Sequence, residues 1–114
     1  MTECLFCKIV ERTIPAALVY EDELVVAFDD INPQAQTHTL VIPRRHVTSV
    51  ADLQDSDVGL LGHLMLAGTK IAKIKGVSDT GYRFVINTGV HGGQSVFHLH
   101  LHILGGRHMA WPPG

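Results

Sequence analysis

The sequence has few charged residues, few aromatic residues and almost no cysteine. Charged residues make up 18% of the 114 positions, aromatic residues make up 6%, and there are two cysteines. Two cysteines are too few for a scaffold held together by several disulfides, so that class of small secreted protein is excluded. Lys and Arg number 9 against 11 Asp and Glu, and the formal net charge is -2. This balance argues against a broad basic surface for nucleic acid.

Long apolar runs, internal repeats and flexible linkers are also absent. No stretch approaches the ~20 apolar residues that cross a bilayer, and the beginning, MTECLFCKIVERT, carries acidic residues where a secretion signal is basic. We therefore expect a soluble cytoplasmic protein with no membrane partner. Hydrophobic residues make up 46% of the chain, which is enough for a buried core. We expect one domain over residues 1–114.

The hydrophobic pattern predicts an α+β fold. Residues 4–11 are expected to form a short helix. Short apolar runs bounded by turn residues predict five strands, over residues 18–20, 24–28, 37–42, 82–87 and 96–104. This order predicts an antiparallel meander with a long helix packed on one face.

The long helix is expected between the third and fourth strands, where the period changes from 2 to about 3.6. Its buried stripe is predicted to be Leu60, Leu64, Ala67, Ile71 and Ile74. The acidic run at 55–57 supplies capping oxygens at its start, and Gly76 provides a left-handed end. The lysines near that end are expected to be solvated; they are Lys70, Lys73 and Lys75.

Histidine is the residue type in excess, with 8 copies in the chain. Three of them alternate with apolar residues in the run HLHLHIL, at positions 98, 100 and 102. In a strand, the three imidazoles project from one face and the apolar side chains from the other. Imidazole can act as a nucleophile, a base or an acid near neutral pH. The run therefore predicts a catalytic row.

His63 is expected to pack within the long helix, and His38, His91 and His108 are expected to be structural or peripheral.

The loop Gly92–Ser95 leads directly into this histidine run. Glycines let backbone N–H groups approach a phosphate closely, and the Gln and Ser side chains add hydrogen-bond donors. Alone, a Gly-Gly pair is as typical of a simple turn. Next to the histidines, the loop predicts an anion site beside the middle imidazole.

The run HLHLHIL resembles the signature of the histidine triad (HIT) superfamily. The similarity extends over nearly the whole chain, through FDDINPQA, VIPRRH, LLGHL, GGQSV and the ending WPPG. That ending resembles the Hint branch, the histidine triad nucleotide-binding proteins. The chain departs from close relatives at Asp29 and Ala110, where those relatives often carry histidines. It also carries Cys4 and Cys7, which some Hint proteins lack.

The resemblance implies a homodimer with one sheet continued across its two-fold axis, in which each protomer binds a purine nucleoside monophosphate. It assigns His100 as a nucleophile that forms a nucleotidyl-histidine. His102 and Ser95 would hold the phosphate and leaving group, while His46 and His98 would extend the imidazole chain behind the nucleophile. Asp30 would accept the ribose hydroxyls. The implied nucleotide-binding residues are Phe28, Asp30, Ile31, Asn87, Gly93, Gln94, Ser95, Val96, His100, His102 and Trp111.

The implied function is hydrolysis of purine nucleoside phosphoramidates, with no cofactor required for catalysis. Two alternatives remain open: a dinucleoside polyphosphate hydrolase or nucleotidyl transferase, and a zinc-stabilised nucleotide-binding scaffold. The spacing of Cys4 and Cys7 is typical of zinc ligands. The superfamily pattern would complete a structural zinc site with His46 and His98. If His98 binds zinc, its ring is not available to relay protons.

Overall fold

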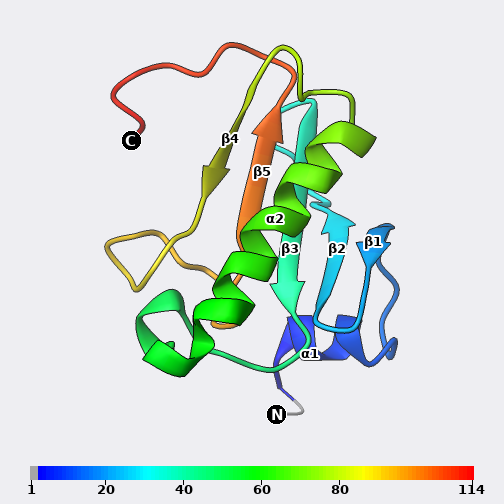
Figure 1. Ribbon diagram of the computed structural model, residues 1–114, viewed down its shortest axis with the longest axis vertical. Coiled ribbons are helices and arrows are strands. Elements are labelled where there is room, and N and C mark those ends of the chain that lie inside the picture. The colour runs from blue at the N-terminus through cyan, green and yellow to red at the C-terminus, as the bar shows by residue number, and fades with distance from the viewer. Residues whose placement is uncertain (1–2) are drawn as a thin grey trace.

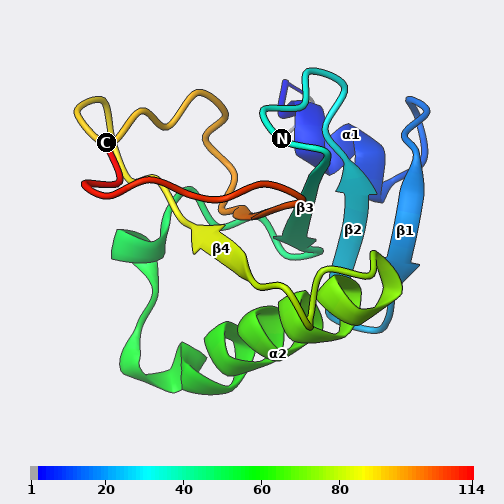
Figure 2. The ribbon, with the colours of Figure 1, turned by 90° about the horizontal axis from the view of Figure 1, so that it is seen from above.

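Two helices lie on opposite faces of one five-stranded antiparallel sheet (Figures 1 and 2). The computed structural model describes residues 3–114. The helices are α1 (Leu5–Val10) and α2 (Val58–Ile74), and the strands are β1 (Leu18–Glu21), β2 (Val25–Asp29), β3 (Thr37–Pro43), β4 (Tyr82–Val85) and β5 (Leu101–Gly105). Two short 3-10 turns, Val50–Asp52 and Asp55–Asp57, precede α2. The predicted α+β class, with one short and one long helix, is confirmed. Neither helix within residues 3–114 has both the length and the hydrophobicity to cross a bilayer.

The order of the strands across the sheet is β1-β2-β3-β5-β4, and every neighbouring pair is antiparallel. The antiparallel sheet is as predicted, but the strands do not follow a simple meander, because β5 lies between β3 and β4. Leu101 and Ile103 of β5 are fully buried, whereas every residue of β4 is only half-buried. The more apolar strand takes the inner position, where both of its edges are paired.

The sheet divides the apolar side chains between two cores. Along β2, Val25 and Ala27 pack in the core beneath α2, while Val26 and Phe28 pack in a second core with α1. The same alternation in β5 directs Leu101 and Ile103 toward α2. The opposite face of β5 therefore carries His102 and Leu104, on the side of the sheet where α1 lies (Figure 2).

Helix α2 ends where predicted and keeps most of its predicted stripe, but the acidic run 55–57 forms a separate 3-10 turn and Asp57 makes no side-chain capping hydrogen bond to α2. Leu64, Ala67 and Ile71 are buried, and Gly76 ends the helix with a φ of +75°. Two expectations are wrong at this end. Ile74 is 58% exposed, and Lys75 is not simply solvated, because its Nζ lies 2.8 Å from Asp29 Oδ1.

The strand predicted over residues 96–104 is shorter in the structure and begins at Leu101. The register pairs Val41 with Leu101, so Pro43 would face Leu99. Proline has no N–H to donate, and the ladder stops there. Leu99 instead donates its N–H to the carbonyl of Val47 at 2.6 Å. The fourth strand is similarly shorter than predicted and ends at Val85.

We predict that Gly68→Val lowers the free energy of unfolding by about 1–3 kcal/mol through overpacking. A Cβ at Gly68 would lie 2.7 Å from Phe84 Cζ and 3.0 Å from Leu101 Cδ2, at the contact between α2 and the sheet. Gly62→Val is the matched control on the same helix, because a Cβ at Gly62 would meet no atom within 4 Å. Urea unfolding should show a change within about 0.5 kcal/mol for the control. Equal losses in both variants would contradict this account.

Candidate active site

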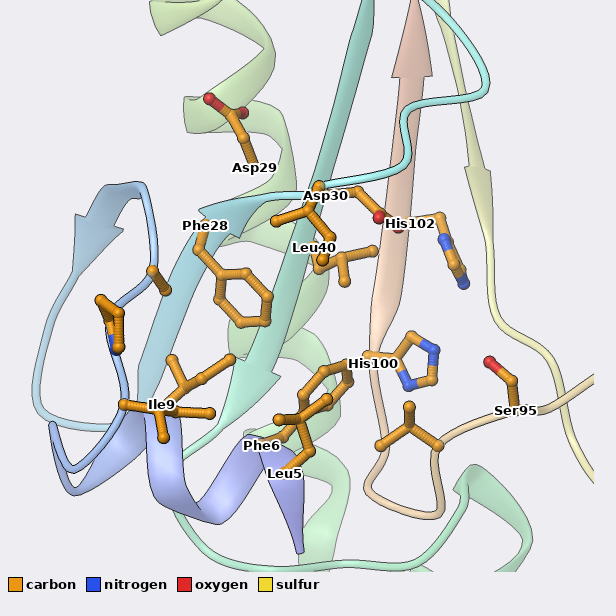
Figure 3. Close-up of a pocket in the computed structure, with 15 residues that line it drawn as sticks. Leu5, Phe6, Ile9, Phe28, Asp29, Asp30, Leu40, Ser95, His100 and His102 are labelled. Atoms are coloured by element: carbon orange, nitrogen blue, oxygen red, sulfur yellow. The ribbon is translucent and has the colours of Figure 1, made fainter.

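A cavity of about 330 Å³ opens on the α1 side of the sheet (Figure 3). One end has apolar walls from α1, β2 and β3. The other end is polar and holds His100, His102, Ser95 and Asp30 (Figure 3). The lining residues are Leu5, Phe6, Ile9, Ile14, Pro15, Ala16, Phe28, Asp29, Asp30, Ile31, Leu40, Ser95, Val96, His100 and His102. An apolar slot that ends in convergent polar groups is typical of a site for a small molecule.

His100 lies in this cavity with its tautomer fixed by the main chain. Its Nδ1 is 2.7 Å from the carbonyl oxygen of His98. A carbonyl oxygen can only accept, so Nδ1 carries the proton and Nε2 of the neutral ring carries a lone pair. Burial lowers the pKa of His100 and favours this neutral form. The arrangement leaves a nucleophilic nitrogen on a buried imidazole.

The rings of His98 and His46 do not continue an imidazole chain behind His100, contrary to the expectation from the sequence. His98 Nε2 is 2.8 Å from the carbonyl of Pro43, and its Nδ1 is 3.3 Å from Cys4 Sγ. His46 Nδ1 is 3.3 Å from Cys7 Sγ. Both ring nitrogens of His98 are thus engaged away from the pocket, and His98 contacts His100 through its backbone carbonyl.

His38, which was expected from the sequence to be structural or peripheral, is hydrogen-bonded to His102 of the histidine run. The backbone N–H of Gln34 donates to His38 Nδ1 at 3.0 Å, so the proton of the neutral ring lies on Nε2. That Nε2 is 2.9 Å from His102 Nδ1, which therefore accepts. The fold brings these residues together because β3 and β5 are paired, and no spacing along the chain indicates the contact.

His102 consequently carries its own proton on Nε2. This nitrogen is buried and has no hydrogen-bond partner, the single such side-chain atom within residues 3–114. Burial, together with the neighbouring His100 and His38, lowers the pKa of His102 to about 4. A neutral donor in a pocket wall fits a ligand that brings an acceptor oxygen.

Two consecutive carboxylates, Asp29 and Asp30, line the cavity and have different surroundings. Asp29 accepts from Thr39 Oγ1 at 2.9 Å and is paired with Lys75. Asp30 accepts the N–H of Asn32 through Oδ1, while its Oδ2 lies 3.5 Å from His38 Nε2. Asp30 is therefore the carboxylate with an oxygen available to a ligand.

Only some of the remaining predicted nucleotide-binding residues lie at the cavity. Phe28, Ile31, Ser95 and Val96 line the cavity, whereas Asn87, Gly93, Gln94 and Trp111 do not. Gln94 is buried, and its side-chain amide is fully used. It donates to the carbonyls of Thr48 and Val96 and accepts from the N–H of Gly89. Gln94 therefore braces the loop instead of presenting its amide to the pocket. Trp111 is 81% exposed and lies over the guanidinium of Arg83.

The apolar wall of the cavity was not predicted from the sequence. Leu5, Phe6 and Ile9 come from α1, and Leu40 comes from β3. Their apolar character is typical of any core, so no local signal marks them as pocket residues. They line the cavity because α1 packs on the same face of the sheet as the histidines.

A second cluster, outside the lining of the cavity, joins Cys4, Cys7, His46 and His98. One donor atom from each residue lies within 4.8 Å of the other three. The sulfur-to-nitrogen distances are 3.3, 3.3 and 3.6 Å, close to the edge of about 3.6 Å expected for a tetrahedral zinc site. The Pro43 carbonyl fixes the proton of His98 on Nε2, so the Nδ1 lone pair faces the thiols, as a metal ligand requires. The donor set fits a zinc ion.

Comparison with known proteins identifies similar chains of the same length. The family model described as "Scavenger mRNA decapping enzyme C-term binding" matches residues 3–111. An uncharacterized HIT-like protein of Synechocystis sp. is 51% identical over 112 residues, covering 98% of this chain and 97% of the relative.

Solved structures of similar sequence have the same fold. A crystal structure of a HIT family hydrolase from Legionella pneumophila is 50% identical and covers 98% of this chain and 100% of its own, with a TM-score of 0.96. A histidine triad protein from Clostridium difficile is 44% identical and covers 96% of each chain, with a TM-score of 0.93. The similarity extends over α1, the sheet and the histidine run together.

We predict that acid destabilises the protein partly through His102. Its pKa is about 4 in the folded chain, against an ordinary value of 6.5, so between these values the unfolded chain binds a proton that the folded chain does not. The free energy of unfolding should therefore fall as the pH falls from 6.5 toward 4. Urea titrations at pH 7 and pH 5 should show a loss about 2 kcal/mol smaller in His102→Gln than in the wild type. An equal pH dependence in both proteins would refute the assignment.

Proposed function

The chain belongs to the histidine triad (HIT) family, and within that family we propose that it is a purine nucleoside phosphoramidate hydrolase. The proposal rests on the environment of His100. The His98 carbonyl holds the Nδ1 proton, so the Nε2 lone pair is free, and the ring lies in a cavity with one apolar and one polar end. A purine fits the apolar end and a phosphate fits the polar end. Residues 1–114 would act as one HIT domain.

In the proposed reaction, His100 Nε2 attacks the phosphorus atom of a nucleoside phosphoramidate. A P–N(His) bond forms as the P–N bond to the leaving amine breaks. The amine departs with the electron pair and takes up a proton from the solvent, and the water that later attacks phosphorus returns a proton to the solvent. The charge left on the imidazole is stabilised by the Nδ1–H bond to the His98 carbonyl. Water then attacks phosphorus, releases the nucleoside monophosphate and restores neutral His100.

The surrounding polar groups have distinct roles in this proposal. His102 Nε2–H would donate to a phosphate oxygen or the leaving group, which explains why a buried donor has no partner in the protein. Ser95 lies across the cavity from the apolar wall and would donate its hydroxyl to the same phosphate (Figure 3). His38 is a positioning residue, because its Nε2–H holds His102 in the tautomer that donates.

The nucleoside would occupy the region that the resemblance implies. Phe28 is 5% exposed and forms an inner wall, while Ile31 is 99% exposed at the rim, so the purine would lie between them. The available oxygen of Asp30 would accept the ribose hydroxyls. Val96 would contact the phosphate through its backbone.

A homodimer would bring in the residues that lie outside the cavity. Strand β4 is one of the two edge strands of the sheet, and its outer side has no partner strand within residues 3–114. Pairing across this edge would continue the sheet into a second protomer. Asn87 and Gly93 lie in the loop between β4 and Ser95, and the exposed Trp111 lies against Arg83 of β4. We propose that this edge is the dimer contact and that Trp111 serves the leaving-group side.

We predict that the wild type releases AMP from adenosine 5′-phosphoramidate in preference to diadenosine polyphosphates, with no added metal. His100→Ala should lower kcat by about 10³-fold or more, because the nucleophile is lost. His91→Gln is the control, since His91 is exposed and lies outside the cavity. Its activity should match the wild type.

Faster turnover of diadenosine polyphosphates would favour the dinucleoside polyphosphate hydrolase or transferase with the same nucleophile. If AMP binds and neither substrate turns over, the nucleotide-binding scaffold is the better description. Retention of full activity in His100→Ala would contradict the proposed mechanism.

The cysteine and histidine cluster favours a structural zinc ion in addition to the catalytic site. Cys4, Cys7, His46 and His98 would hold it, and the ion would tie α1 to the segments that follow β3 and precede β5. No step of the reaction passes through it.

We predict that protein purified without a chelator contains about one equivalent of zinc per chain. Cys4→Ser combined with Cys7→Ser should remove it, because hydroxyl groups are poor ligands for zinc. Elemental analysis measures the content directly. Less than about a tenth of an equivalent in the wild type would exclude the site.

A further inference from the structure

Helix α1 belongs to both the metal cluster and the pocket. Cys4 caps the helix, accepting the N–H of Cys7 on its sulfur at 3.3 Å, and both thiols face the histidines of the cluster. Leu5, Phe6 and Ile9 of the same helix line the cavity (Figure 3). The helix has only 6 residues, and a helix of that length is not stable alone. Its position depends on the tertiary contacts it makes.

The ring of Phe6 connects the two sites through aromatic contacts. Its centroid lies 6.0 Å from that of His98 and 5.1 Å from that of His100, with edge-on geometry in both cases. It also lies 5.4 Å from Phe28, which forms the inner wall of the cavity. A displacement of α1 would move Phe6 and alter both the pocket wall and the packing of the nucleophile.

His98 provides a second connection, through the main chain. Its ring is held between Cys4 on one side and the Pro43 carbonyl on the other. Its own carbonyl oxygen holds His100 Nδ1 at 2.7 Å. An ion bound to the His98 ring would therefore restrain the peptide group that orients the nucleophile.

We propose that the metal cluster is the positioning element of the nucleotide pocket, so that a zinc ion on Cys4, Cys7, His46 and His98 and a nucleoside monophosphate bind with positive coupling. The inference rests on the proposed function only in using a nucleoside monophosphate as the ligand. Metal binding orders α1 and His98 before the nucleotide arrives, and the nucleotide then meets a preformed wall. By reciprocity, the nucleotide tightens zinc binding by the same factor.

Titration calorimetry with AMP on the zinc-loaded and the chelator-treated wild type tests the coupling. We expect AMP to bind at least about five-fold more tightly to the loaded protein. Competition with a chromogenic chelator, with and without saturating AMP, should give the same factor for zinc. Circular dichroism at the titration temperature checks that the metal-free chain is folded.

The variant Phe6→Leu distinguishes a loss of the coupling between zinc and AMP from a general loss of structure, because it leaves every metal ligand in place. Its zinc affinity should stay within about two-fold of the wild type, while the ratio of the two AMP dissociation constants should fall toward one. This ratio is informative even if Phe6→Leu weakens AMP binding in both forms. His91→Gln, which is outside both sites, should keep the wild-type ratio.

The outcomes separate this proposal from the proposed function. AMP affinity that is unchanged by zinc, or zinc that does not bind, overturns the coupling while AMP binding and hydrolysis stand. A ratio in Phe6→Leu equal to that of the wild type overturns the connection through Phe6. If AMP binds neither form and no phosphoramidate is hydrolysed, the proposed function itself fails, and the coupling fails with it.

Discussion

Main-chain groups fix the tautomers of three histidines, and the chemistry of the pocket depends on this constraint. The carbonyl of His98 places the lone pair of His100 on Nε2, and the carbonyl of Pro43 places that of His98 on Nδ1. The N–H of Gln34 sets His38, which in turn sets His102. Each ring would otherwise exchange freely between two neutral forms. The backbone thus gives the same type of side chain three different arrangements: a free Nε2 lone pair on His100, a free Nε2–H on His102 and an Nδ1 lone pair facing the thiols on His98.

The two faces of β5 have different roles, because one packs in the core and the other lies at the pocket. Leu101 and Ile103 are fully buried against α2, which anchors the strand in the larger core. The opposite side can therefore carry His102 and, just before the strand, His100, even though burial disfavours their charged forms and lowers their pKa values. The energetic cost of burying these rings is offset by hydrogen bonds to backbone carbonyls and to His38, except at His102 Nε2. That exception lies where the proposed substrate would supply an oxygen.

Prediction from the sequence failed where a role depends on a partner distant in the chain. His38 and His102 are 64 residues apart, and only the pairing of β3 with β5 brings their rings to 2.9 Å. His98 belongs to the run HLHLHIL by its spacing. Its ring nevertheless faces the thiol of Cys4, which lies 94 residues away in the chain. The sequence also did not predict that β5 lies between β3 and β4. A meander and the observed strand order require the same alternation of buried and exposed residues, so the pattern does not distinguish them.

The sequence by itself determined the class and order of the main elements along the chain and the face on which the histidines lie. These follow from periodicity and local geometry, since the alternation HLHLHIL separates imidazoles from apolar side chains in any extended segment. The tertiary structure alone decided which groups each imidazole meets, and therefore its tautomer, its pKa and its role. It also decided that α1 forms the wall of the pocket. Those properties arise from contacts between segments that are remote in the chain, and residue spacing carries no record of such contacts.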